Sequence, residues 1–213
     1  MQKTIIIIIV LCLTSCSLLK TRLIDVPTGS MANTIIPGDK LVMTTEVGEV
    51  RRGDIVVFKL PLDPKVLYVK RIIGLPGEEI LVRGTEVLVN GNPLPEQHVF
   101  IKLIDNKYGI LPVVRTDPAP PNARWKVFYD EIDTTGDDHL SPGMKYGVRQ
   151  PLRIPAGHYF VMGDSRDNAL DSRFWGIVPA ANIVGKPTLI YSSIDKSVNP
   201  PKERPERAGI KIQ

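Results

Sequence analysis

IVVFKLPLDPKVLYVKRIIGLPGEEILVRGTEVLVNGNPL, residues 55–94, consists of short runs of Val, Ile and Leu that are separated by Gly and Pro. Runs of this kind are typical of β-strands. Gly84 indicates one turn, and the pair Asn90-Gly91 is a strong hairpin signal. From Lys20 onward no stretch keeps the 3.6-residue apolar period of an amphipathic helix. We therefore expect a mainly β domain of antiparallel hairpins over residues 21–195.

The length and charge of the chain restrict its class. Its 213 residues allow one medium domain, or one domain with a small annex. The composition is that of a globular protein, with 43% hydrophobic residues. The net charge is +4 and is spread along the chain, so we expect no nucleic-acid partner.

Two later segments lack the strand pattern. Residues 112–153 contain few apolar runs and many Pro and Asp residues, which predicts an inserted lobe or long loop, with one hairpin around RWKVFYDEI at 124–132. Residues 196–213 are charged and Pro-rich. This composition predicts a disordered basic tail.

The residues that usually bind metals are sparse. The two cysteines, Cys12 and Cys16, both lie in the apolar leader, so the body has no disulfide framework and no thiolate cluster. The histidines His98, His139 and His158 are scattered, without the close spacing of a metal site. We expect no metal and no cofactor.

Residues 1–20 have the pattern of a membrane-directed leader. After Lys3, residues 5–19 are mostly apolar and would form a helix of about 22 Å, short of the roughly 30 Å of a hydrocarbon core. The sequence LTSC at 13–16 resembles a lipobox, in which Cys16 would be acylated after cleavage. An uncleaved membrane anchor and a freely secreted product remain as alternatives. Each of them places the body across the membrane from the cytoplasm.

Ser30, in GSM at 29–31, has the context of a nucleophile but no nearby histidine, since His98 is the nearest in sequence. A lysine can be the general base if its pKa falls from about 10.4 to near 7, at a cost of roughly 4 kcal/mol. Burial among apolar residues causes shifts of that size. Lys70 lies among apolar strand residues and is the candidate, although most strand lysines extend to solvent.

Three segments together resemble the signature motifs of the type I signal peptidases: GSM at 29–31, YVKRIIGLPGE at 68–78 and GDSRDNALDSRFWG at 163–176. They occur in the family's order, behind an amino-terminal membrane segment, and the resemblance covers residues 26–187. It implies the antiparallel β fold of signal peptidases and related repressor-type peptidases. It also implies a Ser/Lys dyad, with Ser30 as nucleophile and Lys70 as general base.

The resemblance also implies roles for residues around the dyad. The Ser30 N–H and the Thr28 hydroxyl would stabilise the oxyanion, and Met31 would pack beside the substrate cleft. Charged residues of the third motif would brace the site through paired Arg and carboxylate groups, and its glycine would free the backbone at a turn. These third-motif residues are Gly163, Asp164, Arg166, Asp171 and Arg173.

Three positions depart from the family pattern. Asn33 replaces a proline that shapes the turn after the nucleophile, and Ser165 replaces an asparagine. Ala169 replaces a serine that often hydrogen-bonds the base lysine. Lys70 would then depend on packing, on water, or on a nearby hydroxyl such as that of Ser172.

The implied function is removal of signal peptides from exported preproteins with small residues before the cleaved bond. The enzyme would be held by its N-terminus in the bacterial cytoplasmic membrane, in contact with lipid, with the catalytic domain on the extracytoplasmic side. An extended substrate would add a strand to a sheet edge.

Alternatives are a Ser/Lys peptidase dedicated to a pilus or conjugation precursor, and a non-catalytic exported lipoprotein that binds exported chains. A self-cleaving repressor would need a DNA-binding domain, for which the sequence has no signal.

Overall fold

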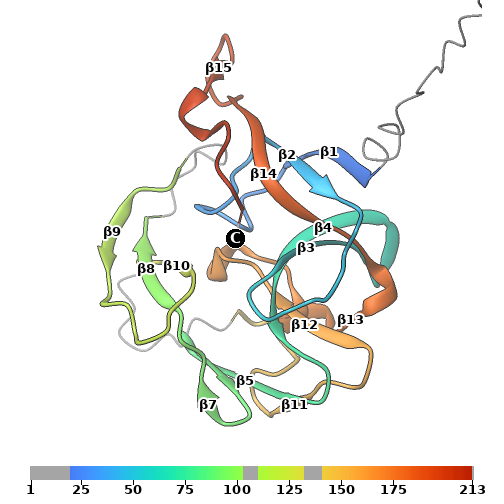
Figure 1. Cartoon of the computed structure of the whole chain (residues 1–213). Coiled ribbons are helices and arrows are strands. Elements are labelled where there is room, and N and C mark those ends of the chain that lie inside the picture. Colours follow the sequence, from blue (N-terminus) through green and yellow to red (C-terminus); the bar gives the residue numbers. More distant parts are fainter. Residues whose placement is uncertain (1–19, 103–109, 132–140, 213) are drawn as a thin grey trace, which may run out of the picture.

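The computed structural model describes residues 20–102, 110–131 and 141–212. The predicted leader, including Cys16, therefore lies outside the described residues. Over those residues, no helix combines the length and the apolar character that crossing a membrane requires. The described chain forms three sheets with little helix, which confirms the expected mainly antiparallel β architecture (Figure 1).

The large sheet has the order β1-β2-β14-β3-β4-β12-β13, with β15 paired to β14. Its strands pair antiparallel throughout. The strands are β1 (Thr21–Asp25), β2 (Asp39–Thr44), β3 (Ile55–Leu60), β4 (Asp63–Gly74), β12 (His158–Met162), β13 (Val178–Pro179), β14 (Ile183–Asp195) and β15 (Lys202–Glu203).

The other two sheets are smaller. One has the order β11-β5-β6-β7 and the other β10-β8-β9. Their strands are β5 (Glu79–Arg83), β6 (Glu86–Val89), β7 (Asn92–Pro93) and β11 (Leu152–Arg153), then β8 (Gln97–Ile101), β9 (Val113–Thr116) and β10 (Lys126–Asp130). Short helices complete the described part: η2 (Arg166–Asn168), α1 (Ser172–Trp175), η3 (Ala180–Asn182) and η4 (Pro205–Arg207).

The predicted hairpins of the opening stretch are confirmed. β3 and β4 pair antiparallel, with Val56 opposite Lys70. Asn90 and Gly91 connect β6 to β7 with φ of 51° and 77°. Both angles lie in the left-handed region that a two-residue hairpin turn needs, and this explains the Asn-Gly pair.

The predicted hairpin at 124–132 is wrong. β10 pairs in parallel with β8, and β9 pairs antiparallel on the other edge of β8. The segment rich in Pro and Asp therefore contributes two strands to a sheet that begins outside it. Alternation of apolar residues predicts a strand but not its partner, and a parallel partner lies far away in sequence. We call β8, β9 and β10 the small sheet.

The loop that carries Ser30, residues 27–38, lies between two packed layers. Met31 and Ile35 pack with residues of the large sheet such as Leu41. Ala32 and Ile36 pack on the opposite side, against the small sheet. This Ser30 loop is therefore fixed by hydrophobic contacts on both sides, although it has no regular secondary structure of its own.

The expectation of disorder over residues 196–213 is wrong for residues 202–212, which pack onto the domain. Arg207 is buried and donates from Nε and Nη2 to the two carboxylate oxygens of Asp39, which is also buried. Arg204 donates from Nη2 to the carbonyl oxygens of Pro37 and Ile194. Composition alone favours disorder here, but these arginines have acceptors in the folded domain, at Pro37 of the Ser30 loop and at Asp39 of β2.

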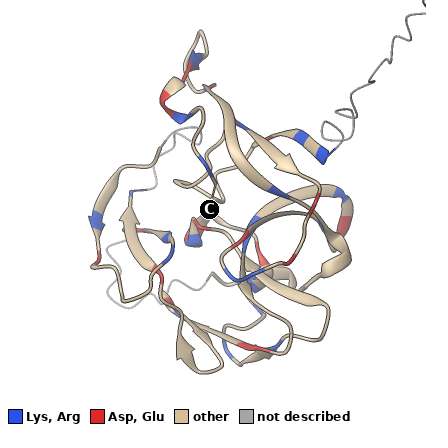
Figure 2. Ribbon diagram, viewed as in Figure 1, with Lys and Arg blue, Asp and Glu red and all other residues tan. Residues whose placement is uncertain are grey.

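Charges are distributed over the whole of the described structure. Figure 2 shows segments of Lys and Arg, and of Asp and Glu, on all three sheets and on the turn between β12 and α1. Several of these charges are buried as pairs, and Arg207 near the end of the chain is among them. In this protein, charged residues therefore contribute to the interior as well as to the surface.

The buried pair of Arg207 and Asp39 yields a stability prediction. Arg207→Leu leaves the Asp39 carboxylate buried without its partner, so we expect the free energy of unfolding to fall by about 3–5 kcal/mol. Urea unfolding of the purified chain measures it. Lys202→Ala, in the same segment but exposed, is the control, and the double variant Asp39→Leu/Arg207→Leu should be less destabilised than Arg207→Leu alone. A cost for Arg207→Leu no larger than that of Lys202→Ala would contradict the role of the pair.

Candidate active site

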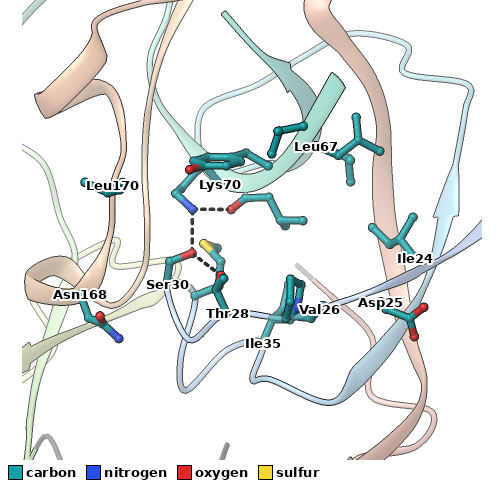
Figure 3. Close-up of a pocket in the computed structure, with 16 residues that line it drawn as sticks. Ile24, Asp25, Val26, Thr28, Ser30, Ile35, Leu67, Lys70, Asn168 and Leu170 are labelled. Carbon is teal, nitrogen blue, oxygen red and sulfur yellow. Dashed lines mark hydrogen bonds between the residues drawn. The ribbon is translucent and has the colours of Figure 1, made fainter. Parts of the chain in front are cut away.

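A cavity of about 570 Å³ lies between the Ser30 loop, β1 and β4. Its walls are mostly apolar, and they include Ile24, Val26, Met31 and Val69. Polar atoms concentrate at one end, where Ser30, Thr28 and Lys70 face one another (Figure 3). Cavities of this composition, apolar with a few converging polar groups, are typical of binding sites.

The structure brings Ser30 and Lys70 together, as the sequence predicts. Lys70 Nζ donates to Ser30 Oγ over 2.7 Å (Figure 3). Forty residues separate the two in sequence, and strand β4 and the Ser30 loop bring them into contact. The Thr28 hydroxyl lies 3.5 Å from that of Ser30. Met31, only 2% exposed, lines the cavity, as expected.

The Lys70 amine is almost completely buried, because the lysine is only 3% exposed. Burial lowers the pKa of Lys70 from 10.5 to about 8, against the opposing effect of the Asp171 and Asp164 carboxylates. The energetic cost of moving a charged amine out of water explains the direction of this change. Near pH 8, Lys70 is therefore neutral in a substantial fraction of the molecules, and the neutral amine is the form that can accept a proton.

The Lys70 amine is oriented without Ser172. Besides Ser30, it donates to the Val69 carbonyl oxygen over 3.0 Å, and it lies 5.0 Å from the centre of the Tyr68 ring. The Ser172 hydroxyl accepts instead from the Val161 N–H, at 2.9 Å. The prediction that Ser172 takes the place of the missing serine as a hydrogen-bond partner of Lys70 is therefore wrong. Helix α1 directs the Ser172 hydroxyl towards β12 instead.

Gly163 lies directly behind Ser30. A methyl group added at Gly163 would overlap the Ser30 carbonyl oxygen and the Ala169 side chain. The Ser30 carbonyl also accepts from the Ser165 N–H, at 3.2 Å. Gly163 is therefore required by close backbone approach, since its φ is not one of the positive values.

Asp164 is held by Arg71, a partner that the sequence analysis did not identify. Arg71 Nε and Nη2 donate to the two Asp164 oxygens over 2.8 and 2.7 Å, and both residues are buried. Thr34 of the Ser30 loop donates to the same carboxylate over 2.6 Å. Because side chains alternate along a strand, Lys70 faces the cavity while Arg71 faces Asp164 behind it. That alternation is the signal that could have identified Arg71.

Asp171 and Arg173 form a second buried bidentate pair. Arg173 Nε and Nη2 donate to the Asp171 carboxylate over 2.9 and 2.8 Å. The same carboxylate accepts from the Gly163 N–H, and Arg173 also donates to the Arg166 carbonyl. This network links the two ends of the turn formed by residues 163–173, as the resemblance implies.

The buried partner of Arg166 is Glu96, which was also missed. Arg166 donates to Glu96, to the Tyr129 hydroxyl and to the Gly163 carbonyl. The Trp125 indole donates to the same Glu96 oxygen over 2.8 Å. Glu96 lies just before β8, in a segment with no motif, so only the tertiary structure reveals this pairing.

Comparisons with known proteins found relatives of this chain. A signal peptidase I of Pseudomonas fluorescens is 32% identical over 79% of this chain and 64% of its own length. One of Aquifex aeolicus is 31% identical over 79% of this chain and 74% of its own. A solved signal peptidase I from Enterococcus faecalis V583 aligns over 66% of this chain and 97% of its own, with 25% identity and a TM-score of 0.41. The chain thus spans slightly less than two thirds of the Pseudomonas relative.

The family model described as "Signal peptidase, peptidase S26" matches residues 1–192, which include the three segments that meet around Ser30 and Lys70. The match covers most of the chain, and two of the named relatives are more than 30% identical to it. The chain belongs to the signal peptidase family, peptidase S26.

Proposed function

We propose that this protein is a serine endopeptidase that removes N-terminal signal peptides from exported preproteins. The observation that carries the proposal is the 2.7 Å contact between a buried lysine amine and a serine hydroxyl at the polar end of an apolar cavity. Membership of the signal peptidase family supplies the reaction class. A non-catalytic binding module would gain nothing from burying the amine, since burial has an energetic cost.

In the proposed mechanism, Ser30 Oγ attacks the carbonyl carbon of the scissile bond while neutral Lys70 accepts its proton. Lys70 then gives this proton to the leaving amine, and a water molecule hydrolyses the acyl-enzyme with Lys70 again as the base. One amine thus performs both transfers, as histidine does in other serine peptidases. The pKa near 8 fits this exchange at neutral to mildly alkaline pH.

The oxyanion is stabilised in this proposal by the Ser30 N–H and the Thr28 hydroxyl. Within residues 20–102, 110–131 and 141–212, no acceptor is bonded to the Ser30 N–H. The Thr28 hydroxyl lies beside the Ser30 hydroxyl, where the carbonyl oxygen of a bound substrate would be. Donors aimed at developing negative charge typically contribute about 3 kcal/mol each to catalysis.

The substrate binds in this proposal as an extended chain along the apolar cavity. β1 is an edge strand of the large sheet, and Ile24, Asp25 and Val26 at its end line the cavity. An edge strand offers unpaired N–H and carbonyl groups to a substrate strand. Short apolar side chains before the cleaved bond suit the apolar walls. Residues 1–20 would keep the active site at the extracytoplasmic membrane surface, where signal peptides emerge.

The test is cleavage of a preprotein at its signal-peptide junction by the full chain in detergent micelles. Ser30→Ala and Lys70→Ala should each abolish cleavage, because one removes the nucleophile and the other the base. Ser197→Ala and the exposed Lys65→Ala, on the same strand as Lys70, are controls that should cleave normally. Near-normal cleavage by Lys70→Ala would refute the mechanism, and cleavage confined to a pilin-type precursor would favour the dedicated processing peptidase.

The pH dependence of cleavage follows from the lowered pKa of Lys70. Protonated Lys70 cannot accept the Ser30 proton, so activity is lost as pH falls below about 8 and is gained as pH rises through it. We expect kcat/KM to rise about tenfold per pH unit at low pH and to level off above pH 8. Circular dichroism at each pH controls for unfolding. A rate that stays constant from pH 6 to 9 would exclude a lysine base with this pKa.

The close approach at Gly163 predicts a catalytic defect. In Gly163→Ala the new methyl displaces the Ser30 carbonyl, so we expect kcat to fall about 100-fold or more. Gly77→Ala is the control: it lies at φ +85° with no neighbour within 4 Å, so it should lose some stability while keeping its activity. Initial rates and thermal melts of both variants distinguish these effects. Equal kcat for Gly163→Ala and wild type would contradict this role of the glycine.

A further inference from the structure

Asn33 joins the Ser30 loop to the segment before β9 through both polar atoms of its side chain. Asn33 Nδ2 donates to the Leu111 carbonyl oxygen over 2.9 Å, and the Leu111 N–H donates to Asn33 Oδ1 over 2.7 Å. The side-chain amide thus pairs with a backbone residue in the way that a second strand would. Asn33 stands three residues after Ser30, on the same loop.

Packing on the same side reinforces the connection. Ala32 and Leu111 belong to one buried cluster with Ile36 of the Ser30 loop and residues of the small sheet. Lys102, just after β8, donates its N–H to the Pro112 carbonyl over 3.0 Å. The segment that receives Asn33 is therefore itself fixed to the small sheet.

The small sheet also holds the segment on the other side of Ser30. The Phe128 N–H, in β10, donates to the Asp164 carbonyl over 2.8 Å, and Phe128 forms a parallel bridge with Ser165. The Ser165 N–H in turn donates to the Ser30 carbonyl. The small sheet is thus connected to Ser30 by two routes: through Asn33 on one side and through Ser165 on the other.

We propose that Asn33 is a positioning residue, which sets the place of the Ser30 hydroxyl against the Lys70 amine by joining the Ser30 loop to Leu111. The inference rests on the proposed function. Asn33 acts through the three peptide units between it and Ser30 and contacts no reacting atom. Asn33→Asp tests the pairing, because aspartate keeps the shape and the acceptor but places a carboxylate oxygen against the Leu111 carbonyl.

The pairing is tested first without reference to activity, by hydrogen exchange and mass spectrometry on the full chain in detergent. Peptides that cover residues 29–36 and 110–116 should exchange faster in Asn33→Asp and in Asn33→Ala than in wild type. Asn182→Asp is the matched control, because the exposed Asn182 amide donates one hydrogen bond, to the Lys59 carbonyl at 3.0 Å. It should leave both peptides unchanged. Unchanged exchange in the Asn33 variants would overturn the proposal, whether or not the protein cleaves a preprotein.

The positioning role is tested second, by preprotein cleavage. Asn33→Asp should lower kcat about 10- to 100-fold with KM within twofold of wild type, since the cavity is intact while the Ser30 hydroxyl is displaced. The pH midpoint should stay near that of wild type, because Lys70 remains buried. A fall in rate that only follows the folded fraction in thermal melts would reduce Asn33 to a structural residue and overturn the proposal. Faster exchange together with an inactive wild type would reject the proposed function and leave the pairing established.

Discussion

The site depends on one costly arrangement: a lysine amine that is kept out of water while it contacts a serine hydroxyl. The apolar cavity and the neighbouring strands of the large sheet provide the dry environment. They lower the pKa of Lys70 to about 8, whereas the nearby Asp171 and Asp164 carboxylates oppose this change. Arginines pair with both carboxylates, and this pairing limits how strongly the carboxylates favour the protonated form of Lys70.

The alternation of side chains along β4 separates two tasks. Lys70 points into the cavity, and Arg71 points into the protein, where it fixes Asp164 and, through Thr34, the Ser30 loop. A buried arginine costs solvation energy, which a bidentate carboxylate partner offsets. Truncation of either partner would leave the other charge unpaired. The contact between Lys70 and Ser30 at one face of β4 therefore depends on an intact ion pair at the other face.

Much of the fold and the contact between Ser30 and Lys70 could be predicted from sequence. Runs of Val and Ile with Gly and Asn-Gly turns predicted the hairpins, and the resemblance of three segments to the signal peptidase motifs, together with the apolar context of Lys70, predicted the contact. The partner Glu96 was missed, because its ion pair is specified by three-dimensional proximity and leaves no periodic pattern. Arg71 was also missed, although the alternation of side chains along β4 could have identified it. Residues 202–212 were mistaken for a disordered tail because Arg204 and Arg207 look solvated until their acceptors, Pro37 and Asp39, are known.

The pairing of Arg207 with Asp39 joins positions that are 168 residues apart, so the last part of the chain closes a loop near its beginning. During synthesis, Ser30 and Asp39 leave the ribosome long before Arg207, which pairs with Asp39. The contact can therefore form only after residue 207 has emerged. Contacts between residues so far apart in sequence slow folding, because the intervening chain must be ordered before they form.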